Sequence, residues 1–238
     1  MHDKEQTLVE HLTELRERII KSLIAVAIGF FAAVFLSQPV FQHIMEQAKA
    51  EGVQLIQYTF ADTFITQIKL ALILGLVLAF PVVLYQVIAF ILPALKPEEK
   101  RLLFIGLPFA TGLFLAGWAF GYFIVVPITK ECFKSMAQAS LVEVAVTPSN
   151  YLSFILSICN PLGIAFELPL VVLILARLGL VTHHFLARVR KYAFLAIMIL
   201  AAVLSPPDVI SMLIFLVPLY GLYEFSIILA RFAEPKPR

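Results

Sequence analysis

The sequence predicts an all-α, polytopic membrane protein, and its composition and charge distribution carry that prediction. Of the 238 residues, 61% are hydrophobic and 14% are charged, whereas a soluble domain has roughly 45–50% and about 25%. The charged residues form short groups that separate long uncharged segments. Several of these segments exceed the roughly 20 residues that a helix needs to cross a bilayer. This composition excludes a soluble enzyme, a nucleic-acid-binding protein and a disordered linker.

Six membrane-spanning helices are expected, within a single integral membrane domain of residues 1–238. The predicted spans cover about residues 20–37, 69–92, 102–127, 150–176, 191–204 and 208–230. Ser205-Pro-Pro-Asp208 separates the last two, because consecutive prolines cannot continue a helix. Tyr192–Leu204 would make only about 20 Å of helix, against a hydrocarbon core of about 30 Å. Either the bilayer is thinner there, or Arg190 and Lys191 extend to the surface from a deeper helix start.

The basic residues predict the orientation. With six spans, fourteen of the eighteen Lys and Arg residues lie on the side that holds both termini, so the positive-inside rule places that side in the cytoplasm. No cleaved signal peptide is expected, because the chain begins with charged residues. The predicted cytoplasmic residues are Lys4, Arg16, Arg18, Lys21, Lys96, Lys100, Arg101, Arg177, Arg188, Arg190, Lys191, Arg231, Lys236 and Arg238. The other side has Lys49, Lys69, Lys130 and Lys134.

An amphipathic helix is predicted at about residues 7–18, on the cytoplasmic surface. Its apolar residues recur at helical spacing: Leu8, Leu12, Leu15 and Ile19. Its polar face carries Glu10, Glu14 and Glu17, and an acidic face beside an anionic leaflet favours a cationic partner. Pairing of Glu14 with Arg18 and of Glu17 with Lys21, four residues apart, is the structural alternative. Both interpretations stay open from spacing alone.

A second acidic group lies in the loop between the second and third spans. Pro97 is expected to be the first residue of a helix, which places Glu98 and Glu99 in its first turn. The helix dipole favours carboxylates at that place without any ligand. However, this group lies on the same predicted face as the amphipathic helix. Together the two groups would bind an extended basic segment.

Glu167 is expected near the middle of the fourth span. A carboxyl group at that depth is costly in contact with lipid, so it should face protein or water. It ends a polar and small face made of Ser153, Ser157, Asn160, Gly163 and Glu167. Pro161 and Pro169 flank this segment and can bend the helix. Either the carboxyl group of Glu167 has a function at this depth, or a protonated Glu167 holds helices together by a hydrogen bond.

Other polar residues have simpler explanations. Asp208 follows the two prolines and is expected mainly to cap the last span. Cys132 and Cys159 predict neither a metal site nor a disulfide framework. No nucleophile–base arrangement is evident, so we expect no enzymatic activity, no metal and no cofactor.

Several motifs in order resemble one known family. They are His11-Leu-Thr-Glu-Leu-Arg-Glu-Arg18, Pro81-Val-Val-Leu-Tyr-Gln86, Phe90-Ile-Leu-Pro-Ala-Leu95 with Glu99, Phe166-Glu-Leu-Pro169 and Ser205-Pro-Pro-Asp208. This set resembles the TatC component of the twin-arginine protein translocase, over nearly the whole chain. The resemblance implies a protein of the bacterial cytoplasmic (inner) membrane that recognises signal peptides with paired arginines and starts the transport of folded proteins.

The resemblance also implies site residues and partners. Glu14 and Glu99 would hold the paired arginines, and Arg16, Phe90 and Lys100 would line or shape that site. Glu167 would lie inside a cupped helix bundle whose fifth and sixth spans are short. The implied partners are single-span Tat subunits of the TatA or TatB type, in an oligomeric complex within the lipid bilayer and without nucleic acid.

Two other classes of function compete with this prediction. In an ion-coupled secondary transporter, Glu167 would carry the proton, but such a protein normally has several ionisable groups at mid-membrane. In a structural scaffold, Glu167 would only join helices, and the two cytoplasmic acidic groups would have no role. The signal-peptide receptor is therefore the main prediction.

Overall fold

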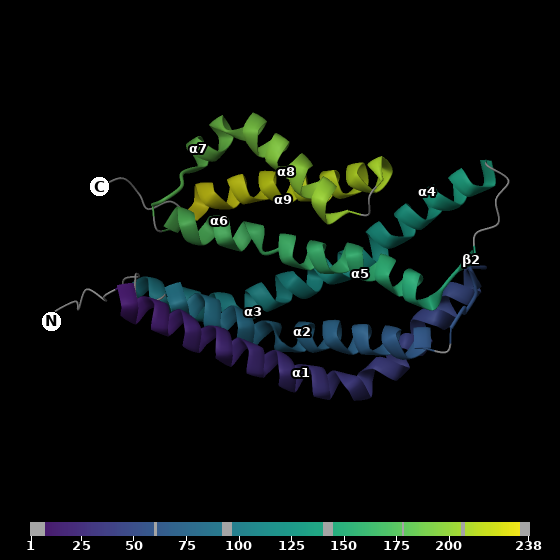
Figure 1. The fold of residues 1–238 in the computed structure, drawn as a ribbon. Helices are drawn as coiled ribbons and strands as arrows, with labels where there is room; N and C mark the ends of the chain where they lie inside the picture. The colour runs from purple at the N-terminus through teal and green to yellow at the C-terminus, as the bar shows by residue number, and fades with distance from the viewer. Residues whose placement is uncertain are drawn as a thin grey trace. The chain divides into compact units, whose positions relative to one another are not determined.

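Helices make up nearly all of the described chain in the computed structural model (Figure 1). The structure describes residues 8–59, 61–91, 97–139, 145–177, 179–205 and 208–233; within these ranges, the side chains of residues 8–10, 91, 97–105, 139 and 233 are not described. Two strands of two residues each, β1 (Gln54–Leu55) and β2 (Ala145–Val146), are the exceptions in these ranges. The chain forms two compact units. Unit 1 comprises residues up to Thr111 and Thr147–Ser149, and unit 2 comprises Gly112–Val146 and the chain from Asn150.

The first helix of unit 1 is longer than the sequence predicted. Helix α1 runs from Leu8 to Ala50 without interruption, so the predicted surface segment, the first span and part of the following loop belong to one helix. Pro39 lies inside it. Gly52, with φ of 77°, follows its end. The amide of Gly52 donates to the carbonyl of Lys49 and that of Val53 to Ala48, both at 3.0 Å. These two hydrogen bonds are the Schellman arrangement, which satisfies the last carbonyl groups of the helix.

Helix α2 (Ala61–Ile91) packs along α1, and glycine allows the close contact. A Cβ atom on Gly75 would lie 2.6 Å from the backbone nitrogen and Cα of Phe30, and one on Gly29 would collide with the carbonyl oxygen of Gly75. Ala33 is fully buried in this region. Small residues let two backbones approach closely in a membrane, where packing rather than hydrophobicity joins helices. The contact fixes the start of α1 relative to the end of α2.

A long helical segment begins in unit 1 and continues into unit 2. Helix α3 (Pro97–Phe120) is followed directly by a π-helical turn, η2 (Gly121–Val125), and by α4 (Val126–Ala139). The wide turn immediately precedes Pro127, which lacks an N–H donor and crowds the preceding turn of an α-helix. The start of α3 at Pro97 confirms the sequence-based prediction for that residue.

The predicted fourth span consists of two helices. Helix α5 (Pro148–Ala165) ends four residues before Pro169, and α6 (Leu168–Arg177) follows a turn at Phe166 and Glu167. The ring of a proline conflicts with the carbonyl group four residues earlier, here that of Ala165, which explains where α5 stops. The expected bend is therefore a break, and it lies at Glu167.

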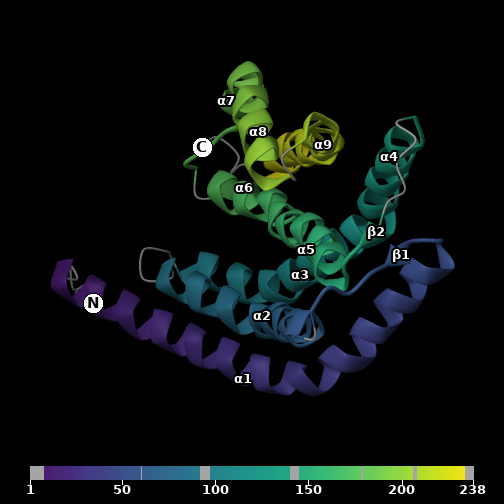
Figure 2. The same cartoon turned by 45° about the vertical axis from the view of Figure 1, so that its right-hand side comes forward.

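The remaining helices of unit 2 form a hairpin with a short preceding helix. They are α7 (His183–Arg188), α8 (Arg190–Leu204) and α9 (Val209–Ala233). Helix α9 packs against α6, α7 and α8, and Figure 2 shows α8 beside α9. The hydroxyl of Tyr223 donates to the carbonyl of Leu186 at 2.8 Å, which joins α9 to α7. Asp208 Oδ1 accepts from the amide of Ser211 at 2.6 Å, which confirms the predicted N-cap.

Five stretches of the described chain are long and apolar enough to cross a membrane. They are His11–Ala50, Ala61–Phe90, Gly106–Gln138, Pro148–Arg177 and Val209–Phe232. Helix α8 has 15 residues, about 22 Å of helix, which is less than the hydrocarbon core. The all-α membrane fold class is thus confirmed. The sixth span and the orientation of the termini stay predictions.

Candidate functional site

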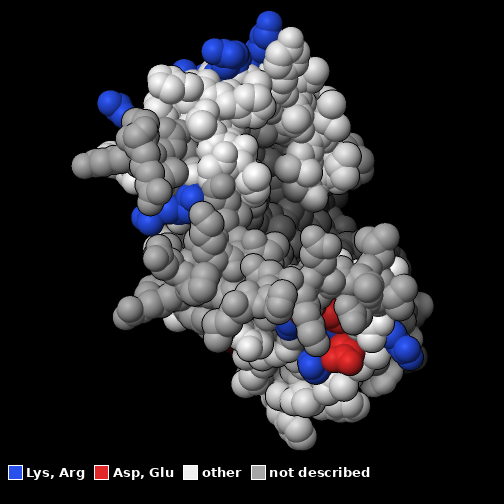
Figure 3. Space-filling view, turned by 90° about the vertical axis from the view of Figure 1, so that its left-hand side faces the viewer, with Lys and Arg blue, Asp and Glu red and all other residues white. Residues whose placement is uncertain are grey.

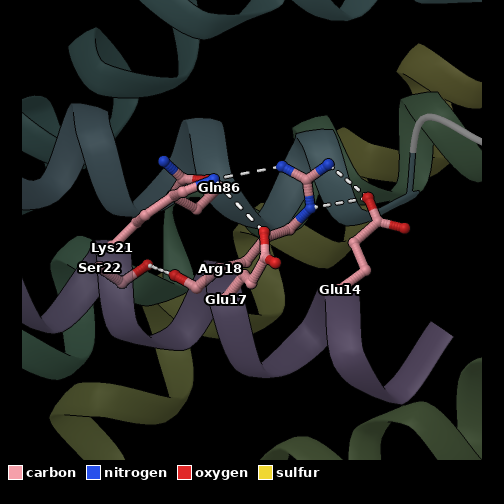
Figure 4. Close-up of polar contacts among 6 residues, drawn as sticks. All are labelled: Glu14, Glu17, Arg18, Lys21, Ser22 and Gln86. Atoms are coloured by element: carbon pink, nitrogen blue, oxygen red, sulfur yellow. Dashed lines mark hydrogen bonds and ion pairs between the residues drawn. The ribbon is translucent and has the colours of Figure 1, made fainter. Parts of the chain in front are cut away.

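The start of α1 carries two ion pairs on successive turns (Figure 4). Arg18 donates to Glu14 Oε1 from Nε at 3.0 Å and from Nη2 at 2.5 Å. Lys21 Nζ lies 3.8 Å from Glu17 Oε2. Both pairs are four residues apart, as the helical spacing predicted. On the face drawn in Figure 3, red and blue side chains lie next to each other in one small cluster.

The two pairs differ in their surroundings. The side chain of Glu14 is 21% exposed, whereas that of Glu17 is 64% exposed. Arg18 also reaches α2, where its Nη1 donates to Gln86 Oε1 at 3.4 Å. The Glu14–Arg18 pair (the inner pair) therefore lies at the contact of two helices. The Glu17–Lys21 pair (the outer pair) lies in solvent. Water screens an exposed pair more strongly, so Glu14 is the better-placed carboxylate for a charged ligand.

Phe90 of α2 lies beside the same part of α1. Its ring stacks on that of His11, with centroids 4.4 Å apart and planes inclined by 22°. His11 precedes Glu14 by three residues, so the two lie about one helical turn apart. Phe90 therefore contacts the turn of α1 that precedes Glu14. A role of Glu14 and Phe90 in binding a signal peptide stays a prediction. Sequence reasoning did not single out His11, Arg18 or Gln86 as site residues, although all three stand inside the quoted motifs.

The structure describes the other implied binding residues only in part. Arg16 is exposed on α1. The backbone of Glu99 and Lys100 belongs to the first turn of α3, within unit 1, eight and nine residues after the end of α2 in the chain. The side chains of Glu99 and Lys100 lie outside the described residues.

Glu167 lies at the break between α5 and α6. Its Oε1 is buried and has no hydrogen-bond partner among the described residues. The polar face predicted around it is used mostly for packing inside unit 2. Asn160 Oδ1 accepts from Trp118 Nε1 at 3.0 Å, and Ser157 donates to the carbonyl of Phe154. A Cβ on Gly163 would lie 2.9 Å from the ring of Phe114. Glu167 therefore stands apart from its predicted polar neighbours.

A further charged group joins α8 to α9. Arg190 Nη2 lies 2.9 Å from Glu224 Oε2, and the hydroxyl of Tyr220 donates to Glu224 Oε1 at 2.9 Å. Sequence reasoning missed this pair. The predicted hairpin of the last two spans could have indicated it. Arg190 stands 14 residues before the end of α8, and Glu224 stands 15 residues after the start of α9. Residues at equal distances from a tight turn face each other in two antiparallel helices.

The sequence is similar to those of a known protein family. The family model for the Sec-independent protein translocase protein (TatC) matches residues 10–218. The TatC protein of Carboxydothermus hydrogenoformans is 40% identical over 237 residues, covering 99% of this chain and 97% of the relative. That of Escherichia coli K12 is 33% identical over 236 residues, covering 98% and 91%.

A solved structure is also similar. The crystal structure of a twin-arginine translocase receptor, TatC, superposes with a TM-score of 0.83 at 36% identity. The match covers 94% of this chain and 99% of that one. With a family model that covers most of the chain, relatives of matching length and the same fold, the chain belongs to the TatC family.

Proposed function

We propose that this chain is the receptor subunit of a twin-arginine translocase in the bacterial cytoplasmic membrane. It recognises signal peptides with paired arginines at the cytoplasmic face and starts the transport of folded proteins. It has six spans with both termini in the cytoplasm, and works in an oligomeric complex with single-span TatA- or TatB-type subunits. Its role is recognition and transport rather than catalysis of a reaction.

The observation that carries this proposal is the environment of Glu14. Its side chain is 21% exposed, and its partner Arg18 reaches Gln86 of α2. One turn earlier on α1, His11 stacks on Phe90 of α2. The carboxylate of Glu14 already accepts two hydrogen bonds from a guanidinium group, that of Arg18, on one oxygen. The second oxygen points away from Arg18 (Figure 4). A carboxylate has acceptor sites for more than one guanidinium group, so a signal arginine can bind beside Arg18.

The second arginine needs a second acidic residue, and Glu99 is the proposed one. Its position in the first turn of α3 is favourable for a carboxylate. Arginine binds carboxylates through two parallel hydrogen bonds and stacks on aromatic rings, whereas lysine is a point charge. The ring pair of His11 and Phe90 provides such a surface. This chemistry predicts that a pair of lysines is a poorer signal. Arg16 and Lys100 shape the site by their charge.

Binding of a precursor to the full-length protein in membranes tests the proposal. We expect site-specific crosslinking to a precursor whose signal contains Arg-Arg, and at least tenfold less when both arginines are lysines. Glu99→Lys should abolish crosslinking, and Glu14→Lys should reduce it strongly, because a half-buried charge pair is replaced by repulsion. Glu17→Lys is the matched control, since Glu17 is one turn away on the same helix and is exposed.

The results separate the residue assignments from the function. Unchanged crosslinking in Glu99→Lys would remove that residue from the site. Equal crosslinking of the arginine and lysine signals would overturn the receptor function itself. Membrane insertion of each variant, measured by protease protection, excludes misfolding as the cause.

Glu167 is proposed to act after signal binding. Its buried carboxyl oxygen has no hydrogen-bond partner in the described part of the chain and lies at a helix break inside the fourth span. An ionisable group at such a place is a candidate for function. Glu167→Gln is expected to reduce export of a precursor more than it reduces signal binding. Equal loss of both steps would make Glu167 a structural residue.

A further inference from the structure

We propose that unit 2 binds anionic phospholipids at the end where α6 and α9 stop and α8 begins. The proposed ligand is the phosphate headgroup of a lipid such as phosphatidylglycerol, with its acyl chains beside the helices. This site is separate from the charged start of α1 and does not depend on signal-peptide recognition.

Basic residues predominate in this region. Five exposed basic residues lie at or near these helix ends: Arg177, Arg188, Arg190, Lys191 and Arg231. The described part of α6 to α9 has one acidic residue near them, Glu224, and it pairs with Arg190. Asp208 caps the opposite end of α9. On the face drawn in Figure 3, this helix group shows several blue side chains and no red one.

Helix packing gathers these basic residues from four helices. Arg177 ends α6, and a turn with Gly179 at φ of 72° leads into α7. Arg188 ends α7 two residues before Arg190 starts α8. Arg231 follows Glu224 by seven residues, about two turns of α9, and so lies on the face that meets Arg190. Because α9 packs against α6, α7 and α8, the cations share one end of the group.

Exposed apolar side chains accompany the charges and identify the partner as lipid. Leu180 is 70% exposed and Phe232 is 79% exposed, and Phe185 and Tyr192 are also exposed. Lys191 Nζ lies 4.9 Å from the ring centroid of Tyr192. Basic residues beside aromatic and aliphatic ones suit the boundary between headgroups and acyl chains. An acidic protein segment would use the charges but leave these apolar side chains in water.

Basic residues at the end of a membrane helix attract anionic lipids with a measurable effect. Each Lys or Arg near an anionic surface strengthens binding by roughly fivefold, so removal of two weakens it by about 30-fold. Arginine adds paired hydrogen bonds to phosphate oxygens. Four basic residues remain after Arg190 is paired with Glu224, which is enough to prefer an anionic over a zwitterionic headgroup.

Lipid titration of the purified full-length protein in a non-ionic detergent tests the site. Binding of phosphatidylglycerol and phosphatidylcholine with identical acyl chains is measured by native mass spectrometry. We expect phosphatidylglycerol to bind at least tenfold more tightly. Arg188→Gln with Lys191→Gln should weaken it about 30-fold, and so should Arg177→Gln with Arg231→Gln. The matched control is Lys49→Gln with Lys69→Gln, two exposed lysines of unit 1, which should leave the preference intact.

Three results would overturn the proposal. They are equal binding of the two lipids by the wild-type protein, an equal loss in the Lys49/Lys69 control, and full competition by soluble glycerol phosphate at the concentration of the lipid. The last result would mean a site for free phosphate rather than for lipid. The unfolding temperature of each variant without added lipid shows that it is folded, and the two independent double variants keep the test valid if one of them is not.

Discussion

The two charged regions of this protein use opposite arrangements of charge. At the start of α1, acidic and basic residues alternate and pair along one helix, Glu14 with Arg18 and Glu17 with Lys21. At the α8 end of unit 2, the basic residues outnumber Glu224, the one acidic residue described there, which pairs across two helices. The first region presents a half-buried carboxylate and the second an excess of cations. In the two proposals, the sign of the charge that is left unpaired, and not the number of charges, decides which ligand the region binds.

The largest expected effect tests whether the first region depends on the close packing of α1 and α2. Gly75→Ala places a Cβ 2.6 Å from the backbone of Phe30, so the helices must separate. We expect a loss of about 1–3 kcal/mol in the free energy of unfolding, and weaker binding of the Arg-Arg signal because Glu14 moves relative to Phe90. The preference of unit 2 for phosphatidylglycerol should not change.

Gly112→Ala is the control for that change. A Cβ on Gly112 meets no atom within 4 Å, and alanine favours a helix over glycine by roughly 0.5–1 kcal/mol. Chemical unfolding should therefore show Gly112→Ala as neutral or slightly more stable. If both glycine variants behave alike, the close contact of α1 with α2 does not position the first region.

Arg18→Gln tests how the Arg18–Glu14 pair affects binding of a signal peptide in the first region. Arg18 already binds one oxygen of Glu14 and so neutralises part of the charge that would attract a signal arginine to the other oxygen. A partly exposed ion pair contributes about 0.2–1 kcal/mol. Its loss should raise the affinity for an Arg-Arg signal by up to roughly fivefold, measured with a labelled signal peptide. Lys21→Gln, in the exposed outer pair, should have little effect. A lower affinity in Arg18→Gln would instead make Arg18 a residue that positions Glu14.

Glu224→Gln is the corresponding change in the second region, because it also removes one partner of an ion pair. It has the smallest expected effect. It removes the acid that pairs with Arg190 and retains an oxygen for the hydroxyl of Tyr220. The pair is more exposed than that of Glu14, with side-chain exposures of 50% and 33%, so we expect only about a two- to threefold gain in phosphatidylglycerol affinity. An unchanged or lower affinity would show that Arg190 does not take part in lipid binding.

Much of the local structure followed from the sequence. The long uncharged segments predicted an all-helical membrane protein, and residues four apart predicted the two ion pairs of α1. Pro97 marked the start of α3 and Asp208 the cap of α9. These features depend on neighbours within a few residues of the same chain segment, so the spacing of residue types is sufficient to find them.

Some local expectations needed correction by the structure. The sequence suggested a surface helix, a span and a loop where α1 is continuous to Ala50, because Pro39 is accommodated inside the helix. It suggested one bent fourth span where the chain breaks at Glu167. A proline indicates that a helix is disturbed, but the packing around it decides between a bend, a break and continuation.

The contacts between helices that build the two regions depend on tertiary structure. Gly29 against Gly75, His11 on Phe90 and Arg190 with Glu224 each join residues of different helices. Composition and periodicity specify that a helix forms and which residues share a face. They do not specify which faces meet, because that depends on how closely two backbones can approach and at what register. The sequence determined the helices and their charges, and helix packing decided which side chains of different helices meet.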